Sequence, residues 1–417
     1  MMVKKLYLDI LMKKIPNFLK KCKKLGLKLS QIKKIENSVK KVGGNLFIIG
    51  GNVRDLVLEK KISSNPDLVC DLPIQLVIKS LNKSKFSISK VGLKFNSIVI
   101  KINDVYLDLT SMRKDLTTDG RWATTQYTKE IFEDARRRDF TINAIYCDTH
   151  GKIFDPFNGI KDLMNSKVKF IGPSEERVKE DFLRILRFLR FSYNYSSSLD
   201  KEGLKACKKL IKNIKTLSFE RRIQELKKIL LLEKVGNKKI IDSLSPFIAV
   251  SIGCEIDTTR FDFFCNLERS LGDISFERRL KFLIRKSKIS NLEILDRINK
   301  KTKNRILSKI NIPKKSRKRL NSLLYNNQKI LIFDQLIEDF SDKKISKKNF
   351  EEFVRLNQMF KKTKFPIDGT DLTKIGVKKN ATMGKVLEKV KNWWIQNDFK
   401  PKKKECEKYA KSLFTNL

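Results

Sequence analysis

The chain has 417 residues, enough for several domains that each bury an apolar core. It contains 91 Lys and Arg residues against 47 Asp and Glu residues, and the difference, 91 − 47, gives a net charge of +44. This excess predicts a polyanionic partner, and nucleic acid is the natural candidate. The abundance of Lys, Asn and Ile is also typical of AT-rich coding sequences, which gives the charge a second explanation.

A single histidine, His150, argues against a histidine-based catalytic triad or a zinc cluster. The 7 cysteines are odd in number and form no CxxC pair, which indicates reduced, mostly buried thiols. No long uncharged apolar segment is present, and the N-terminal segment has no signal-peptide core. We therefore expect a cytoplasmic protein without a membrane partner, and no sequence feature identifies a protein partner.

In chain order, helical patterns to about Val42 are followed by a strand, a glycine pair and a helix. Phe47–Ile49 is a short apolar run that ends in Gly50-Gly51, and the apolar spacing from Val53 predicts a helix. Such a corner gathers backbone N–H groups and the positive end of a helix dipole, which suits a triphosphate. Arg54 is placed to add a charge-assisted fork to the same phosphates. A plain tight turn explains the glycine pair equally well.

Two later segments carry acidic residues on predicted strands. Asp67 begins a strand-like run, and residues 98–102 and 105–109 flank an Asn-Asp pair that predicts a β-hairpin. On the second hairpin strand Val105, Leu107 and Leu109 share one face, so Asp108 points to the other face with Tyr106 and Thr110. Asp108 is then either solvated or, beside the strand of Asp67, part of a metal-binding cleft.

The next segment is polar and then strongly basic. Residues 117–121, Thr-Thr-Asp-Gly-Arg, have the composition of a mobile loop. Three adjacent arginines, residues 136–138, suit phosphate or ribose binding, and Asp139 is positioned to hold one of them in place. A surface charge cluster is the alternative.

Residues 180–191 predict an amphipathic helix. Its apolar face carries Phe182, Ile185, Leu186 and Leu189, the opposite face carries Arg184, Arg187 and Arg190, and Asp181 lies at the border. The basic face is either solvated or part of a binding site. Beyond it the chain has helical patterns to its end, with Ser218 positioned as an N-cap and a Lys/Arg-rich segment at 307–324. That segment suits either a phosphate backbone or a solvated helix face.

Several of these stretches resemble the class II tRNA nucleotidyltransferase and bacterial poly(A) polymerase family. They are GGNVRDLVL at 50–58, RRRDFTINA at 136–144, DPFNGIKDL at 155–163, EDFLRILRFLRF at 180–191 and SFERRIQEL at 218–226. The resemblance runs from about residue 46 to 399 and is weakest between about 237 and 360. It implies an α+β fold in which a nucleotidyltransferase head with a small mixed β-sheet precedes an all-α neck, body and tail. The implied parts are an N-terminal helical segment at 1–42, a head at 43–170, a neck at 171–235, a body at 236–330 and a tail at 331–417.

The resemblance also implies roles for individual residues. Asp67 and Asp108 are implied to be catalytic and to bind Mg²⁺ in a two-metal site, whereas Asn65 stands where the family has a metal-binding Asp. A neutral amide is a poorer ligand for a hard cation. The implied nucleotide-binding residues are Gly50, Gly51, Arg54, Arg138, Asp139, Asp181, Arg184, Arg187 and Arg190. Among these, Asp181 and Arg184 form a protein template whose hydrogen-bonding edges select CTP or ATP. Asn158 stands where Gly is common, and Asn tolerates left-handed backbone.

The implied reaction is addition of C, C and A from CTP and ATP to the 3′ end of tRNA, with release of pyrophosphate. Residues 91–99 are closer to the CCA-adding pattern than to the basic segment of poly(A) polymerases, and the C-terminal segment resembles that of CCA-adding enzymes. Two alternatives remain open. One is poly(A) addition to RNA, and the other, prompted by Asn65, is a non-catalytic RNA-binding relative.

Overall fold

The computed structural model describes residues 14–62, 65–82, 86–119, 122–288, 293–312, 317–326, 328–359, 363–377 and 381–414. They form two compact units. The first unit comprises Met1–Lys234 and Pro246–Ile252, and the second comprises Val235–Ser245 and Gly253–Leu417. Each unit has a hydrophobic core of its own.

The first unit is built on a mixed seven-stranded sheet with the order β3-β4-β5-β2-β1-β8-β9. All neighbouring strands are antiparallel except β2 and β5, which are parallel. The predicted hairpin is confirmed, since Ile102 pairs with Val105 across the turn. The strands are β1 (Leu46–Ile49), β2 (Asp67–Cys70), β3 (Ser87–Ser89), β4 (Ser97–Ile102), β5 (Val105–Ser111), β8 (Tyr146–Cys147) and β9 (Ile153–Phe154).

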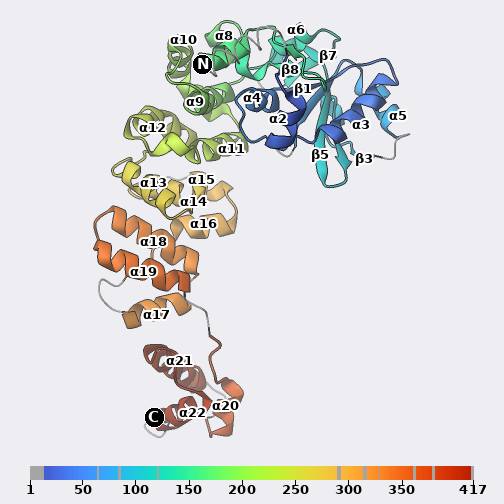
Figure 1. Cartoon of the computed structure of the whole chain (residues 1–417). Helices are drawn as coiled ribbons and strands as arrows, with labels where there is room; N and C mark the ends of the chain where they lie inside the picture. The colour runs from blue at the N-terminus through green and yellow to red at the C-terminus, as the bar shows by residue number, and fades with distance from the viewer. Residues whose placement is uncertain are drawn as a thin grey trace. The chain divides into compact units, whose positions relative to one another are not determined.

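Four helices pack on one face of this sheet (Figure 1). They are α2 (Phe18–Leu25), α3 (Leu29–Lys40), α4 (Gly51–Val57) and α5 (Ile74–Asn82). Their apolar residues share a core with Leu68, Leu107 and Leu109, which confirms the predicted alternation along β5. The other face carries Val69 and, two residues earlier on the same strand, Asp67. The acidic side chains therefore lie on the face away from these helices.

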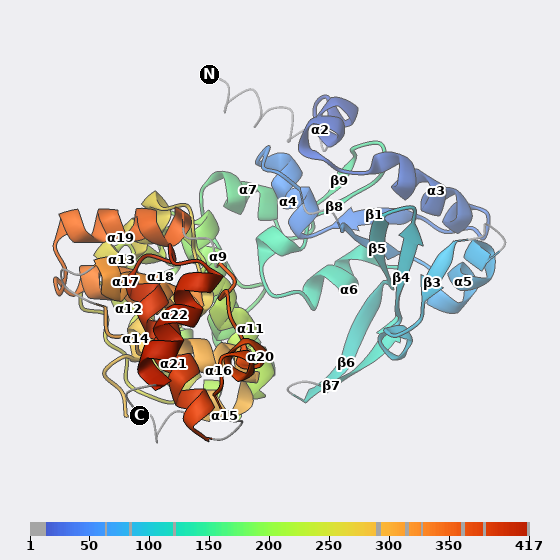
Figure 2. The same ribbon diagram turned by 90° about the horizontal axis from the view of Figure 1, so that it is seen from below.

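The loop predicted at 117–121 is wrong for residues 117–119, which belong to a strand. β6 (Arg113–Asp119) and β7 (Trp122–Tyr127) pair as an antiparallel ribbon with a register irregularity between Asp115 and Thr117. Gly120 and Arg121 lie outside the described residues. Figure 2 shows this ribbon projecting beyond the main sheet. Sequential β-branched threonines favour the paired strands over a loop.

Short helices connect the sheet to the helical part of the first unit. They are α6 (Ile131–Arg136), α7 (Gly159–Met164), α8 (Ser174–Glu180), α9 (Leu183–Tyr195), α10 (Lys201–Lys209) and α11 (Phe219–Leu230), with 3₁₀ turns at Leu93–Phe95, Thr141–Asn143, Ile211–Thr216 and Glu233–Gly236. Asn158 precedes α7 with a φ of 56°, as expected for an Asn in a glycine-like position. Ser218 occupies the N-cap of α11, but its side chain makes no capping hydrogen bond.

The second unit is helical. Its helices are α12 (Lys238–Ile252), which also contributes to the first unit, α13 (Phe261–Ser270), α14 (Phe276–Ile284), α15 (Glu293–Arg297), α16 (Lys300–Leu307), α17 (Arg317–Asn326), α18 (Lys329–Ser341), α19 (Lys347–Met359), α20 (Gly369–Lys374), α21 (Ala381–Gln396) and α22 (Lys403–Phe414). Part of the basic segment 307–324 lies outside the described residues. All seven cysteines are free thiols, and all except Cys254 are buried. Among the described helices, none is long and apolar enough to span a bilayer.

Candidate active site

The glycine corner lies between β1 and α4, as predicted. Gly50 has a φ of 59° and a ψ of −119°, a left-handed conformation that disfavours any residue with a Cβ. Its N–H donates at 3.0 Å to the carbonyl of Ile145, the residue before β8, which ties the corner to the strand that pairs with β1. A Cβ on Gly51 would lie 3.4 Å from Nη2 of Arg54, so the corner also leaves room for this guanidinium.

Two carboxylates lie beside the corner. Asp67 on β2 and Asp108 on β5 are register partners on parallel strands, so their side chains leave the same face of the sheet as neighbours. Burial and the charge of Asp108 raise the pKa of Asp67, against the opposing charge of Arg138. A pair of close, incompletely neutralised carboxylates suits a divalent cation. Asn65 is exposed two residues earlier. The described residues contain no group of three or more His, Cys, Asp and Glu side chains that could hold a metal.

Arg54 is buried and already has partners within the protein. Its Nη1 donates to Oδ1 of Asn143 at 2.7 Å, its Nε lies 3.3 Å from Oδ1 of Asp55, and its Cζ lies 4.1 Å from the centroid of the Tyr195 ring. These contacts hold one side of the guanidinium, while Arg54 still lines the cleft. The predicted fork to phosphate therefore starts from a fixed arginine.

Asp139 holds an arginine, but the predicted partner is wrong. Its Oδ2 accepts from Nε and Nη2 of Arg187, both at 2.6 Å, rather than from one of the three adjacent arginines. Its Oδ1 accepts from Nδ2 of Asn143 at 3.0 Å. Burial acts to raise the pKa of Asp139, but Arg187 and Asn143 outweigh it and the pKa lies below its ordinary value. Asp139 therefore joins the sheet part of this unit to α9.

Arg138 is held by a residue that the sequence reasoning missed. Asp134 is fully buried, and its carboxylate accepts from Nη2 of Arg138 at 2.9 Å and from the Tyr146 hydroxyl at 2.6 Å. It also accepts from Nε of Arg137 at 2.9 Å. Burial favours the neutral acid, yet the two arginines lower the pKa of Asp134 well below its ordinary value. The spacing of four residues between Asp134 on α6 and Arg138, just beyond the end of that helix, was the available signal.

The predicted continuous helix at 180–191 is interrupted. α8 ends at Glu180, Asp181 has extended backbone with φ −157° and ψ 108°, and α9 begins at Leu183. Oδ1 of Asp181 accepts from the Leu183 N–H at 3.0 Å, which satisfies a donor in the first turn of α9. The interruption turns the Asp181 side chain into the cleft, where a continuous helix would have placed it at the border of the basic face.

The side chains of Asp181 and Arg184, the implied template, both have hydrogen-bond partners within the protein. Oδ2 of Asp181 accepts from Nη2 of Arg221 at 2.7 Å. Nη1 of Arg184 donates to Oε2 of Glu180 at 2.6 Å and to the Arg177 carbonyl at 2.9 Å. Arg221 was not among the predicted site residues, because its partner lies 40 positions earlier in the chain.

Arg190 and Arg187 share an acidic neighbour on α11. Nε of Arg190 donates to Oε2 of Glu225 at 2.7 Å, and Nη1 of Arg187 lies 3.9 Å from Oε1 of the same residue. Burial tends to raise the pKa of Glu225, but Arg190 and its other cationic neighbours lower it below the ordinary value. Glu225 thus remains an anion that spaces the two arginines.

These residues meet in one cleft of about 410 Å³. It is lined by Ile49, Gly50, Gly51, Arg54, Asp67, Arg138, Asp139, Asn143, Asp181, Arg184, Arg187, Arg190 and Phe191. Asp108 is not part of the lining but is the register partner of Asp67, and Asn65 is likewise outside the lining. The sheet corner and the α8–α9 junction, far apart in sequence, therefore face a common space.

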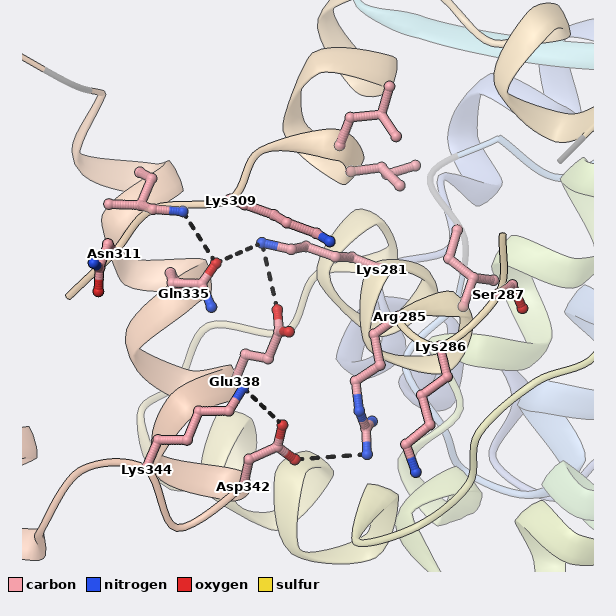
Figure 3. Close-up of a pocket in the computed structure, with 14 residues that line it drawn as sticks. Lys281, Arg285, Lys286, Ser287, Lys309, Asn311, Gln335, Glu338, Asp342 and Lys344 are labelled. Carbon is pink, nitrogen blue, oxygen red and sulfur yellow. Dashed lines mark hydrogen bonds and ion pairs between the residues drawn. The ribbon is translucent and has the colours of Figure 1, made fainter. Parts of the chain in front are cut away.

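A second hollow of about 580 Å³ lies in the second unit, where α14, α16 and α18 end. Most of its charges are paired internally (Figure 3). Lys281 lies 3.4 Å from Glu338, and Asp342 lies 3.6 Å from Arg285 and 3.2 Å from Lys344. Cations near helix C-termini also complement the helix dipole. None of the predicted site residues lines this hollow.

Known proteins are similar to this chain both in sequence and in fold. Residues 46–169 match the Poly A polymerase head domain family. The human mitochondrial CCA tRNA nucleotidyltransferase 1 is 28% identical over 386 residues, which cover 88% of this chain and 86% of the human protein. A CCA-adding enzyme of Staphylococcus epidermidis is 28% identical over 217 residues, 52% of each chain.

Solved structures share the fold. The Bacillus stearothermophilus CCA-adding enzyme, crystallised in complex with CTP, superposes with a TM-score of 0.72 at 20% identity and covers 93% of this chain and 98% of its own. The Thermotoga maritima CCA-adding enzyme complexed with tRNA has a TM-score of 0.63 at 19% identity and covers 92% of this chain and 95% of its own.

A mixed sheet with a glycine corner, paired carboxylates and an arginine-lined cleft defines a nucleotidyltransferase head followed by helices. Residues 46–169 match the Poly A polymerase head domain family, and the chain is similar to CCA tRNA nucleotidyltransferases over most of its length.

Proposed function

We propose that this enzyme adds C, C and A to the 3′ end of tRNA without a nucleic-acid template, using CTP and ATP and releasing pyrophosphate. The observation that carries the proposal is the single cleft that contains the glycine corner, Asp67, Asp181 and Arg184. The match to the human CCA tRNA nucleotidyltransferase over 86% of that protein's length supports the same reaction.

Selection of the base rests on Asp181 and Arg184. Asp181 supplies acceptors for the exocyclic amine of cytosine or adenine, and Arg184 supplies donors for a ring acceptor. Each Asp181 oxygen has one hydrogen bond within the protein, which leaves it a lone pair for a base. UTP and GTP present mismatched edges to this pair, and a mismatched buried edge is costly.

The phosphates are bound by the arginines of the cleft. Arg54, Arg187 and Arg190 offer planar donor forks, which match phosphate oxygens better than an ammonium group does. Asp139 and Glu225 hold Arg187 and Arg190 in fixed orientations before the nucleotide arrives. Such preorganisation lowers the cost of orienting charge at the moment of reaction.

Asp67 and Asp108 fit a divalent cation, because they are adjacent carboxylates, and desolvation together with the charge of Asp108 raises the pKa of Asp67. We propose that they hold Mg²⁺ with Asn65 as a weaker neutral ligand. When bound, the ions supply acidity to the RNA 3′-hydroxyl and neutralise charge on the leaving pyrophosphate. The substitution of Asn for Asp at residue 65 predicts measurable but reduced turnover.

The products formed on a tRNA that ends before its CCA test the proposal. The assay contains Mg²⁺ and labelled CTP and ATP, supplied separately and together. Addition of two C residues with CTP, completed by one A when ATP is present, supports CCA addition. Long A-tails identify a poly(A) polymerase. Tight tRNA binding without incorporation identifies a non-catalytic RNA-binding protein, and either of these outcomes contradicts the proposal.

A further inference from the structure

One aromatic ring lies against three arginines of the cleft. The Phe191 ring centroid is 4.2 Å from Cζ of Arg190 and 5.3 Å from Cζ of both Arg54 and Arg187. Phe191 is only 6% exposed, and it lines the same cleft as these arginines. The arginines arrive from different elements, since Arg54 belongs to α4 and the other two belong to α9.

Three guanidinium groups held this close repel one another, so each needs a fixed environment. Each guanidinium has a hydrogen-bond acceptor at one edge. Asn143 accepts from Arg54, Asp139 accepts from Arg187, and Glu225 accepts from Arg190. Hydrogen bonds at one edge leave the plane of a guanidinium free to tilt. A ring face adds the second constraint, because guanidinium groups stack on aromatic faces and are attracted by the ring quadrupole.

The Phe191 ring is held in place by other aromatic residues of the first unit. It packs 5.4 Å from the fully buried Phe140 and 6.0 Å from Tyr195, measured between centroids. Tyr195 in turn stacks on Arg54. A rotation of Phe191 would therefore disturb its aromatic neighbours, which makes the ring a rigid support.

We propose that Phe191 is a positioning residue that sets the spacing of Arg54, Arg187 and Arg190 so that together they bind the triphosphate of the incoming nucleotide. It acts through these arginines and contacts no reacting atom. The inference rests on the proposed function, since it assumes that the cleft binds CTP and ATP.

The chain offers a matched control for a test. Phe191→Leu removes the aromatic face but retains an apolar side chain, and Phe191→Tyr restores the ring. Phe188→Leu makes the same change one turn earlier on α9, at a fully buried ring that packs on Phe140 and Phe170. Dissociation constants for CTP and CMP are measured by calorimetry for all four proteins, together with the Tm of each.

We expect Phe191→Leu to weaken CTP binding by about tenfold while CMP binding changes by about twofold or less, because the lost cation–π contacts act on the groups that bind the outer phosphates. Phe191→Tyr should restore CTP binding. Phe188→Leu should lower Tm at least as much without this selective loss. Equal CTP affinities of the two Leu variants, or equal losses for CTP and CMP, would overturn the inference alone. Failure of the unaltered protein to bind CTP would instead overturn the proposed function.

Discussion

Asp67 and Asp108 occupy the same register on two parallel neighbouring strands. Their carboxylates are therefore held together by the backbone pairing of β2 and β5 and not by a flexible loop. Desolvation and the charge of Asp108 raise the pKa of Asp67 above its ordinary value. The repulsion between the two carboxylates is relieved when a proton or a divalent cation binds.

This repulsion predicts a pH-dependent effect of Mg²⁺. With its pKa raised above the ordinary 3.8, Asp67 contributes stability below that pH and loses it as the pH rises through the raised value. Mg²⁺ should replace the proton at neutral pH. We expect Mg²⁺ to increase Tm by a few degrees near pH 7 and to have almost no effect near pH 4. An equal increase in Tm for Asp67→Asn would show that the ion binds elsewhere.

Restoring a carboxylate at residue 65 should strengthen the metal site. Asn65→Asp adds an anionic ligand. We expect the Mg²⁺ concentration that gives the half-maximal rate to fall about tenfold and the kcat for CMP addition to rise. Asn103→Asp is the control, since it adds the same charge at the exposed turn between β4 and β5. If Asn65→Asp and Asn103→Asp behave alike, Asn65 is not at the metal site.

The Asp139–Arg187 pair predicts a loss of stability when it is broken. Asp139→Asn removes the closest anionic partner of the partly exposed Arg187, which keeps Glu225 at 3.9 Å, and we expect a decrease of about 1–3 kcal/mol in the free energy of unfolding of the first unit. Because the pKa of Asp139 is lowered, its stabilisation is present above the ordinary 3.8 and is lost as the pH falls through the lowered value. Urea unfolding across this range measures both effects.

Glu175→Gln provides the comparison, because this exposed carboxylate pairs with Lys179 and Lys209 on the surface and its loss should matter little. Equal effects of Asp139→Asn and Glu175→Gln would contradict the assigned role of the buried pair.

Arg221 should matter for base selection. Its hydrogen bond to Oδ2 of Asp181 fixes the carboxylate that is proposed to read the base. We expect Arg221→Ala to reduce the ratio of kcat/KM for CTP over UTP by about tenfold, in line with losing a charge-assisted hydrogen bond. Lys209→Ala, an exposed residue paired with Glu175, is the control. An unchanged ratio with a lower overall rate would assign Arg221 a purely structural role.

Local patterns predicted much of the head. The apolar run before Gly50, the helix after it and the hairpin of β4 and β5 each depend on residues close in sequence, where alternation and turn chemistry are informative. The family motifs also placed most of the proposed site residues in one cleft. The roles of these residues remain predictions.

The local patterns did not predict contacts between residues that are far apart in sequence. Asp139 has an arginine immediately before it, yet its partner is Arg187, 48 positions later, because the chain folds α9 against this turn. The interruption at Asp181 was also hidden, since residues 180–191 have uninterrupted helical periodicity and the break depends on Arg221 and on the Leu183 N–H. Residues 117–119 misled in the opposite direction, because their polarity indicated a loop where β6 pairs with β7.

The most direct measurement of the central claim is the initial rate of CMP and AMP addition to a tRNA that ends before its CCA, compared between the unaltered protein and Asp108→Asn. We expect CCA addition by the unaltered protein and a loss of rate on the order of a thousandfold in the variant, with tRNA binding retained. Equal rates for the two proteins would contradict the assignment of Asp67 and Asp108 as the catalytic pair.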